Sequence, residues 1–190
     1  TAMEQATVVT EFENLSVCPS NVDLAGAEIE LVGVENRENC LKIALSKVKD
    51  DYDYIIIDCP PSLGLLTLNA FVCADTILIP IQCEYYALEG LSQLIKTIRL
   101  VKKGLNPSLD IEGVLLTMFD ARTNLSIQVA DEVKKYYPKK VYASVIPRNV
   151  RLSEAPSYGQ PITVYDENSK GAESYTKLAN EVIERNEGVK

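Results

Sequence analysis

The stretch that decides the fold is YIIIDCPPS, residues 54–62. Its four consecutive apolar residues, which do not alternate with polar ones, are typical of a strand covered on both faces in a parallel sheet. The run ends at the carboxylate of Asp58, after which Pro60 and Pro61 indicate a sharp turn. An aspartate at this point either caps the turn or helps to hold Mg²⁺, often through water, because a hard cation prefers oxygen ligands. On these residues alone both interpretations stay open.

The remaining chain alternates short apolar runs with longer segments of helical period. Leu41, Ala44, Leu45 and Val48 show the spacing of one apolar helix stripe, for example. We expect strands at 15–18, 54–57, 76–79, 111–117 and 141–145, and helices at 41–48, 91–101, 127–137 and 171–185. This order predicts an α/β fold, a doubly wound and mostly parallel sheet with helices on both faces. No internal repeat or linker interrupts it, so we expect one domain over residues 1–190.

The amino-acid composition excludes several kinds of catalytic and metal site. The chain has 190 residues, a formal net charge of −8 and no histidine, which excludes imidazole bases, Ser-His triads and His-ligated metals. Its five cysteines include no C-x-x-C pair and indicate reduced side chains rather than a disulfide framework. No apolar run approaches the roughly 20 residues of a spanning helix, so we expect a cytoplasmic protein. Any contact with DNA would need a local cluster of arginine and lysine.

Four longer strings occur in order along the chain. They are DYDYIIIDCPPSLG (residues 51–64), QCEYYALEGL (82–91), LTMFDARTN (116–124) and IPRNVRLSEAP (146–156), with LAGAEIEL (24–31) ahead of them. Together they closely resemble the ParA/Soj partition ATPases, and the resemblance runs from about residue 15 to the end. It implies a P-loop NTPase of deviant Walker type that dimerises, binds nonspecific DNA when it holds ATP, and hydrolyses ATP under stimulation by a ParB-type partner. We therefore expect a chromosome or plasmid partitioning protein associated with the nucleoid.

The resemblance also implies roles for single residues. Asp58 matches the Walker B aspartate, which holds Mg²⁺ through water. Met118, Pro147, Arg148 and Asn149 match the segments that border the adenine, although Met118 is almost as well explained by core packing. Two arginines, Arg122 and Arg151, match surface residues that hold DNA phosphates; each could instead pair with a neighbouring carboxylate, Asp120 or Glu154.

One part of the family pattern does not occur in this sequence. The K-G-G-x-G-K-T phosphate loop is absent, and Gly26 and Gly33 lack both its spacing and its Lys-Thr pair. A D-x-D-P-Q-G-N segment that positions the attacking water is absent as well. We therefore expect a truncated domain that lacks its first strand, phosphate loop and first helix. ATP and Mg²⁺ would belong to the intact protein, and this chain would bind neither and would not hydrolyse ATP.

Two other functions remain open. A MinD-like membrane-cycling ATPase would need a basic, amphipathic carboxyl-terminal helix, yet residues 180–190 are acidic and lack aromatic residues, so we expect no membrane binding. A protein of the same fold that binds partners independently of nucleotide is the second alternative.

Loss of a central strand would leave the edges of the sheet unpaired, so we also expect self-association.

Overall fold

The computed structural model describes residues 2–187, which form two compact units. Within that range, unit 1 consists of the residues up to 75 and of 94–110, and unit 2 of 76–93 and the residues from 111 onward. The prediction of a single domain stays a prediction. No helix in the described range is long and apolar enough to cross a membrane.

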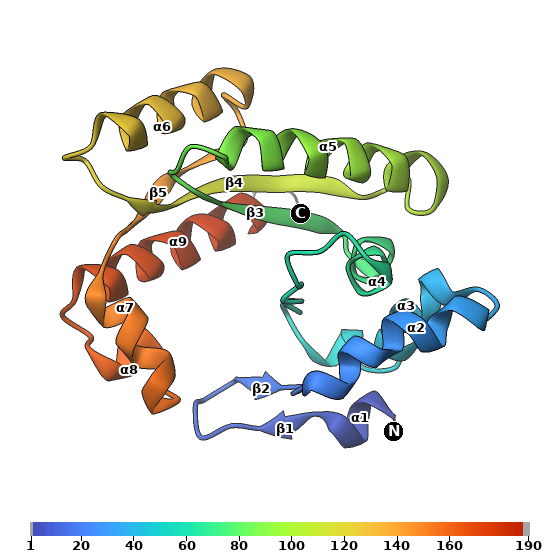
Figure 1. Ribbon diagram of the computed structural model, residues 1–190. Helices are drawn as coiled ribbons and strands as arrows, with labels where there is room; N and C mark the ends of the chain where they lie inside the picture. Colours follow the sequence, from blue (N-terminus) through green and yellow to red (C-terminus); the bar gives the residue numbers. More distant parts are fainter. Residues whose placement is uncertain (1, 188–190) are drawn as a thin grey trace. The chain divides into compact units, whose positions relative to one another are not determined.

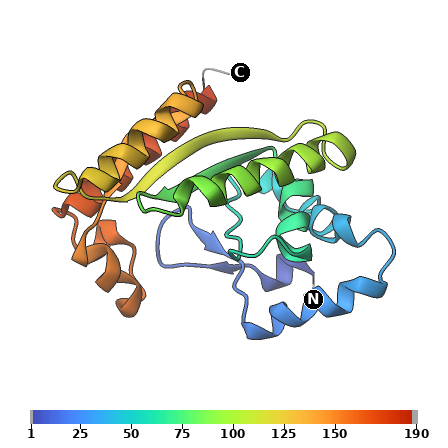
Figure 2. The same ribbon diagram turned by 45° about the horizontal axis from the view of Figure 1, so that its top comes forward.

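Unit 2 contains a three-stranded parallel sheet in the order β3-β4-β5 (Figure 1). Its strands are β3 (Thr76–Gln82), β4 (Asp110–Phe119, which enters the unit at residue 111) and β5 (Val141–Pro147). β4 is the middle strand, and Figure 2 shows it as the long, curved one. These strands confirm the predictions at 76–79, 111–117 and 141–145 and extend each of them.

Helices flank this sheet, as the α/β prediction requires. They are α6 (Asn124–Tyr136), α7 (Val150–Glu154), α8 (Ile162–Tyr165), α9 (Lys170–Glu187) and the first part of α5 (Ala87–Gly104), with a 3₁₀ turn η5 (Ala155–Tyr158). Figure 1 shows α6 and α9 on opposite sides of β4 and β5. The helices predicted at 91–101, 127–137 and 171–185 are confirmed, because apolar residues at helical spacing give each one a buried stripe.

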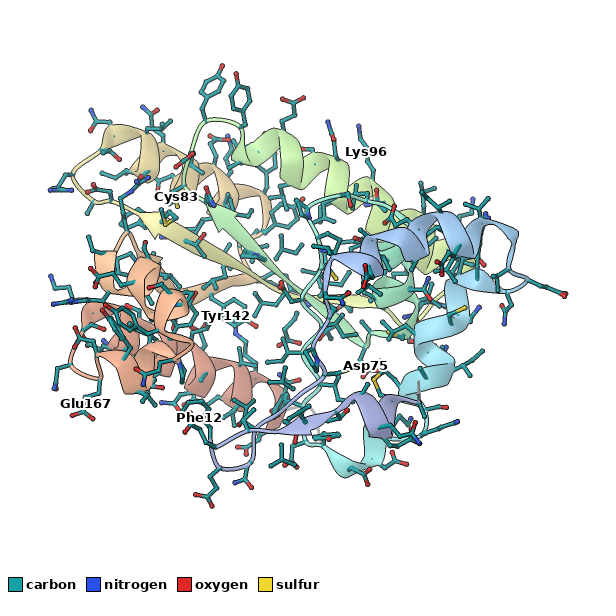
Figure 3. All side chains as sticks on the ribbon, turned by 60° about the horizontal axis from the view of Figure 1, so that its bottom comes forward. Phe12, Asp75, Cys83, Lys96, Tyr142 and Glu167 are labelled. Atoms are coloured by element: carbon teal, nitrogen blue, oxygen red, sulfur yellow. The ribbon has the colours of Figure 1, made fainter. Side chains whose placement is uncertain are left out.

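The core of unit 2 lies between the sheet and α9. Leu115, Tyr142, Ile146 and Leu178 form one buried cluster. The Tyr142 ring is covered by the Arg185 guanidinium, whose carbon lies 4.0 Å from the ring centroid. Figure 3 shows Tyr142 in the interior of this unit. Burial, with the Glu112 carboxylate adding to it, raises the pKa of Tyr142 to about 12. The phenol is therefore neutral at physiological pH.

Unit 1 is built mainly from short helices. They are α1 (Met3–Ala6), α2 (Ala27–Glu30), α3 (Cys40–Leu45), α4 (Leu65–Cys73) and the later part of α5, with 3₁₀ turns at Val22–Gly26, Leu31–Gly33, Arg37–Asn39 and Lys49–Asp51. Two strands, β1 (Val8–Val9) and β2 (Ser16–Val17), form an antiparallel hairpin. The strand predicted at 15–18 is therefore present but short, and it pairs within this hairpin rather than in the main sheet.

The strand predicted at 54–57 is wrong. Residues 53–61 have no regular secondary structure other than a bend at Asp53 and at Pro61, and they form a loop between α3 and α4 (Figure 1). Tyr54 and Ile55 are exposed, and Ile56 is 92% exposed. A strand covered on both faces needs neighbours to bond its backbone, and no ladder within residues 2–187 includes this run.

Two helices of unit 1 also differ from the prediction. α3 ends at Leu45, so Val48 is buried beyond the end of the helix rather than on its stripe. α4 was not predicted at all. Its sequence, LLTLNAFVC, is apolar nearly all round and therefore lacks a single stripe. Asn69, buried within it, accepts from the Leu41 amide and donates to the Arg37 carbonyl, which ties α4 to the first turn of α3 and to the 3₁₀ turn before it.

Candidate functional site

The candidate site of unit 2 lies at the carboxyl edge of its sheet. Each parallel strand delivers charged residues there: Glu84 follows β3, Asp120 follows β4 and Arg148 follows β5. Ligands of open α/β sheets bind at this edge, outside the carboxyl ends of the strands. Arg148 donates to Glu84 at 3.2 Å, which links the chain after β5 to the chain after β3.

Met118 has an unusual backbone conformation near the end of β4. Its φ is +52°, in the left-handed region that a side chain with a Cβ rarely adopts. The register of β4 against β5 shifts between Leu116 and Phe119, so Met118 lies in a bulge or other irregularity of the ladder. Bulges re-aim side chains and concentrate next to active sites. Met118 is half-buried, like its neighbours Thr117 and Phe119, and its role beside an adenine stays a prediction.

The segment 147–149 turns the chain from β5 into α7. Pro147 is the last residue of β5 and pairs with Phe119 across the ladder, and the Arg148 amide donates to the Phe119 carbonyl at 3.1 Å. The Asn149 side-chain oxygen accepts from the Leu152 amide at 3.3 Å and so caps α7. This segment therefore lies beside the end of β4, and the Asn149 oxygen is already engaged.

Arg122 forms a bidentate pair with Asp120. Its Nε donates to Oδ1 at 2.9 Å and its Nη2 to Oδ2 at 2.7 Å, while the Arg122 amide donates to Oδ1 at 3.0 Å. Hydrogen bonds from Arg122, together with the charge of Arg148, hold the pKa of Asp120 near 2. The carboxylate is therefore ionised at neutral pH, and the Arg122 side chain remains 87% exposed.

Arg151 is held by two acids. Its Nη1 donates to Glu154 at 2.9 Å and its Nε lies 3.2 Å from an Asp166 oxygen. The Tyr165 hydroxyl donates to the same Glu154 oxygen at 3.1 Å. Hydrogen bonds from Arg151 and Tyr165 lower the pKa of Glu154, and the bond to Glu154 raises the pKa of Arg151 further. Both pairings anticipated for the arginines, with Asp120 and with Glu154, are thus present.

Asp58 belongs to unit 1, whereas the other six predicted site residues belong to unit 2. It is exposed and lies in the irregular loop rather than at the end of a strand. Its charge adds to burial in raising the pKa of the neighbouring Cys59 thiol. Among the described residues, no group of three or more acidic or cysteine side chains is arranged to hold a metal ion.

The sequence lacks the parts that hold the phosphate end of a nucleotide. The contact of Met118 and residues 147–149 with an adenine stays a prediction, and the Arg148 amide is already bonded to the Phe119 carbonyl. The sequence contains no glycine-rich loop followed by Lys-Thr, so it has no cradle for β and γ phosphates. Asp58 alone is an insufficient set of ligands for Mg²⁺, which usually also takes oxygens from the phosphates.

Three acidic or phenolic residues of the site were not predicted as functional. Glu84 follows β3 and forms an ion pair with Arg148 at 3.2 Å. Tyr165 and Asp166 are distant from Arg151 in sequence and meet it only because α8 returns towards α7. No spacing in the sequence signals those two contacts.

Comparisons with known proteins identify relatives of this chain. A family model described as "AAA domain" matches residues 1–111. Sporulation initiation inhibitor protein Soj of Bacillus subtilis is 68% identical over 173 residues, which are 91% of this chain and 68% of that protein. Chromosome partitioning protein ParA of Myxococcus xanthus is 61% identical over 93% of this chain and 62% of its own length. The chain thus spans about two thirds of these relatives.

Solved structures show the same fold. Cobyrinic acid a,c-diamide synthase from Mycobacterium smegmatis, with bound ADP and magnesium, is 37% identical and aligns with a TM-score of 0.84 over 100% of this chain and 70% of that one. The cell division ATPase MinD of Pyrococcus furiosus is 25% identical, with a TM-score of 0.75 over 97% of this chain and 71% of that one.

Proposed function

The chain belongs to the Soj/ParA family, and from this premise we propose that it serves chromosome or plasmid partitioning. The observation that carries the proposal is the 68% identity to Soj of Bacillus subtilis over 91% of the chain. We infer a cytoplasmic, nucleoid-associated protein whose intact form binds ATP with Mg²⁺ and dimerises. The dimer binds nonspecific DNA and hydrolyses ATP when a ParB-type partner stimulates it.

DNA binding is assigned to Arg122 and Arg151 at the carboxyl edge of the unit 2 sheet. Nonspecific affinity for DNA comes from neutralised phosphates, and arginine binds phosphate through the same fork that it offers to a carboxylate. Each arginine is engaged by an acid, so binding requires an exchange of carboxylate for phosphate. Exposed ion pairs are weak because water screens their charges, so this exchange costs little.

The exchange predicts opposite effects for two substitutions in one pair. Arg122→Ala removes a phosphate contact and should weaken binding to a random-sequence duplex while lowering its salt dependence by about one contact. Asp120→Asn releases Arg122 and should strengthen binding. Fluorescence anisotropy over a range of salt, on the intact protein with ATP and Mg²⁺, measures both effects. Lys135→Ala on α6 is an exposed control that removes the same charge. Equal effects of Arg122→Ala and Lys135→Ala would refute the assignment.

Nucleotide binding is tested by calorimetry with Mg²⁺-ATP on this chain and on Asp58→Ala. We expect no binding to either, because the phosphate loop that offsets the charge of the phosphates is missing from the sequence. We also expect no steady-state release of phosphate. Binding that Asp58→Ala weakens would show that other residues hold the nucleotide and would overturn our account.

A nucleotide-independent interaction protein is the second candidate, favoured by the absence of a phosphate loop from the sequence. It predicts partner binding that ATP leaves unchanged.

The MinD-like candidate is less well supported, because α9 carries glutamates through its length and ends in the acidic Glu187. Gly188, Val189 and Lys190 of the predicted tail lie outside the described residues. Flotation with anionic liposomes tests this candidate, and we expect no binding.

A further inference from the structure

The second half of α5, within unit 1, carries an exposed basic face on an otherwise acidic protein. Lys96, Arg99, Leu100 and Lys103 follow one another at i, i+3, i+4 and i+7, the spacing of one helix face. All four are exposed, and Leu100 is 71% exposed. We call this set the α5 stripe. It concentrates three positive charges on a chain whose net charge is −8.

The cations of the stripe are not neutralised within the described part of the chain. No ion pair joins Lys96, Arg99 or Lys103 to an acid of residues 2–187, whereas the adjacent Lys102 pairs with Asp110 at 3.5 Å. Figure 3 shows Lys96 projecting outward from α5. The stripe therefore differs from the arginines of unit 2, each of which already has a carboxylate partner.

An apolar groove lies beside the stripe in the same unit. It has a volume of about 450 Å³. One wall comes from α4 and the loop before it, with Leu63, Leu68 and Phe71 among its residues, and the other from α5 and its end, with Leu100 and Leu105. Leu100 belongs to both the groove and the stripe. An occupant of the groove would therefore be within reach of the cations.

We propose that the groove and the α5 stripe together dock an acidic amphipathic helix of a partner protein. Leucine-like anchors at i, i+3, i+4 and i+7 would enter the groove, and flanking carboxylates would pair with the three cations. Nucleic acid is the poorer match, because phosphates would use the cations but leave Leu100 and the groove exposed. This site involves neither nucleotide nor the arginines of unit 2, so it does not depend on the proposed function.

The probe is a fluorescein-labelled synthetic peptide of about four helical turns with leucines on one face and glutamates beside them. A scrambled peptide of the same composition is its control. By anisotropy we expect the amphipathic peptide alone to bind, with affinity that falls as salt rises. The triple variant Lys96→Glu, Arg99→Glu, Lys103→Glu should lose about tenfold or more, and Leu100→Ser a smaller but measurable factor. All four side chains are exposed, so the variants should fold.

A matched variant controls for net charge. Lys134→Glu, Lys135→Glu, Lys139→Glu changes three exposed lysines of unit 2 by the same amount and should leave peptide binding unchanged. Equal binding of both peptides, or equal loss in both triple variants, would overturn the proposal. Loss of duplex DNA binding in the stripe variant with unchanged peptide binding would also overturn it and assign the stripe to nucleic acid. If Arg122 proves not to bind DNA, the proposal for the groove and the α5 stripe still stands.

Discussion

Two apolar runs of this chain, each followed closely by an aspartate, have opposite structures. Residues 114–116 of unit 2 lie in the middle strand of a parallel sheet, and their side chains are at most 4% exposed. Residues 54–56 of unit 1 have no regular secondary structure, and each is more than 40% exposed. Isoleucine has a high strand propensity, so intrinsic preference cannot explain the difference. The hydrogen-bonded strands on both sides of residues 114–116 do explain it.

The comparison shows what a central strand requires. β4 has β3 on one side and β5 on the other, so both rows of its backbone groups are bonded, and helices α6 and α9 lie on its two faces (Figure 1). The 54–57 run is as apolar, but within the described residues no strand pairs with it. An unpaired apolar run is a site for association with other chains, which supports our expectation that this chain self-associates.

The largest difference between the two runs should appear when an aspartate is placed in each of them. Val114→Asp buries an unpaired carboxylate at a fully buried position and should cost more than about 4 kcal/mol of unfolding free energy. Ile56→Asp should change the free energy by no more than about 0.5 kcal/mol, because its side chain is 92% exposed. Urea unfolding followed by circular dichroism measures both.

Light scattering of the second variant sharpens the comparison. Ile56→Asp should reduce self-association, since it breaks the exposed apolar run. A loss of stability from Ile56→Asp as large as that from Val114→Asp would show that residues 54–57 are buried after all. A monodisperse monomer of the unsubstituted chain would contradict the predicted self-association.

Glycine substitutions provide a smaller effect with opposite signs. A Cβ at Gly113 in β4 would clash with the Tyr142 ring and meet the Lys140 carbonyl oxygen at 2.9 Å, so Gly113→Ala should destabilise by about 1–3 kcal/mol. Gly90 in α5 has open space around its Cβ position, and Gly90→Ala should stabilise by about 0.5–1 kcal/mol. Thermal unfolding compares them. Destabilisation by both would mean that the space beside Gly90 is filled.

The smallest effect concerns the acid dependence of the unit 2 edge. Arg122 holds the pKa of Asp120 near 2, below its ordinary value of 3.8. Because the folded pKa is lowered, the stabilising contribution is complete above the ordinary value and disappears as the pH falls through about 2. Carbon-detected NMR should show Asp120 titrating near pH 2 and nearer its ordinary value in Arg122→Ala. An unchanged midpoint in the variant would refute the pairing.

Much of unit 2 could be predicted from the sequence. Its strands follow from apolar runs and its long helices from apolar stripes, because each local pattern agrees with the neighbours that the same unit supplies. The candidate arginines and their acidic partners could also be anticipated, since Asp120 and Glu154 are close to them in sequence. The contacts of Arg151 with Tyr165 and Asp166 could not, because they depend on how α7 and α8 fold back.

By itself the sequence determined the family, the α/β class, the absence of a phosphate loop and the identity of the edge residues. These properties belong to local strings whose chemistry does not depend on distant partners. Only the tertiary structure decided that Ile55 and Ile56 remain exposed, that Met118 adopts a left-handed backbone, and that the cations of the α5 stripe lie beside an apolar groove. Burial, backbone pairing and the meeting of separate helices are properties of neighbours in space, and a single run of residues does not specify its neighbours.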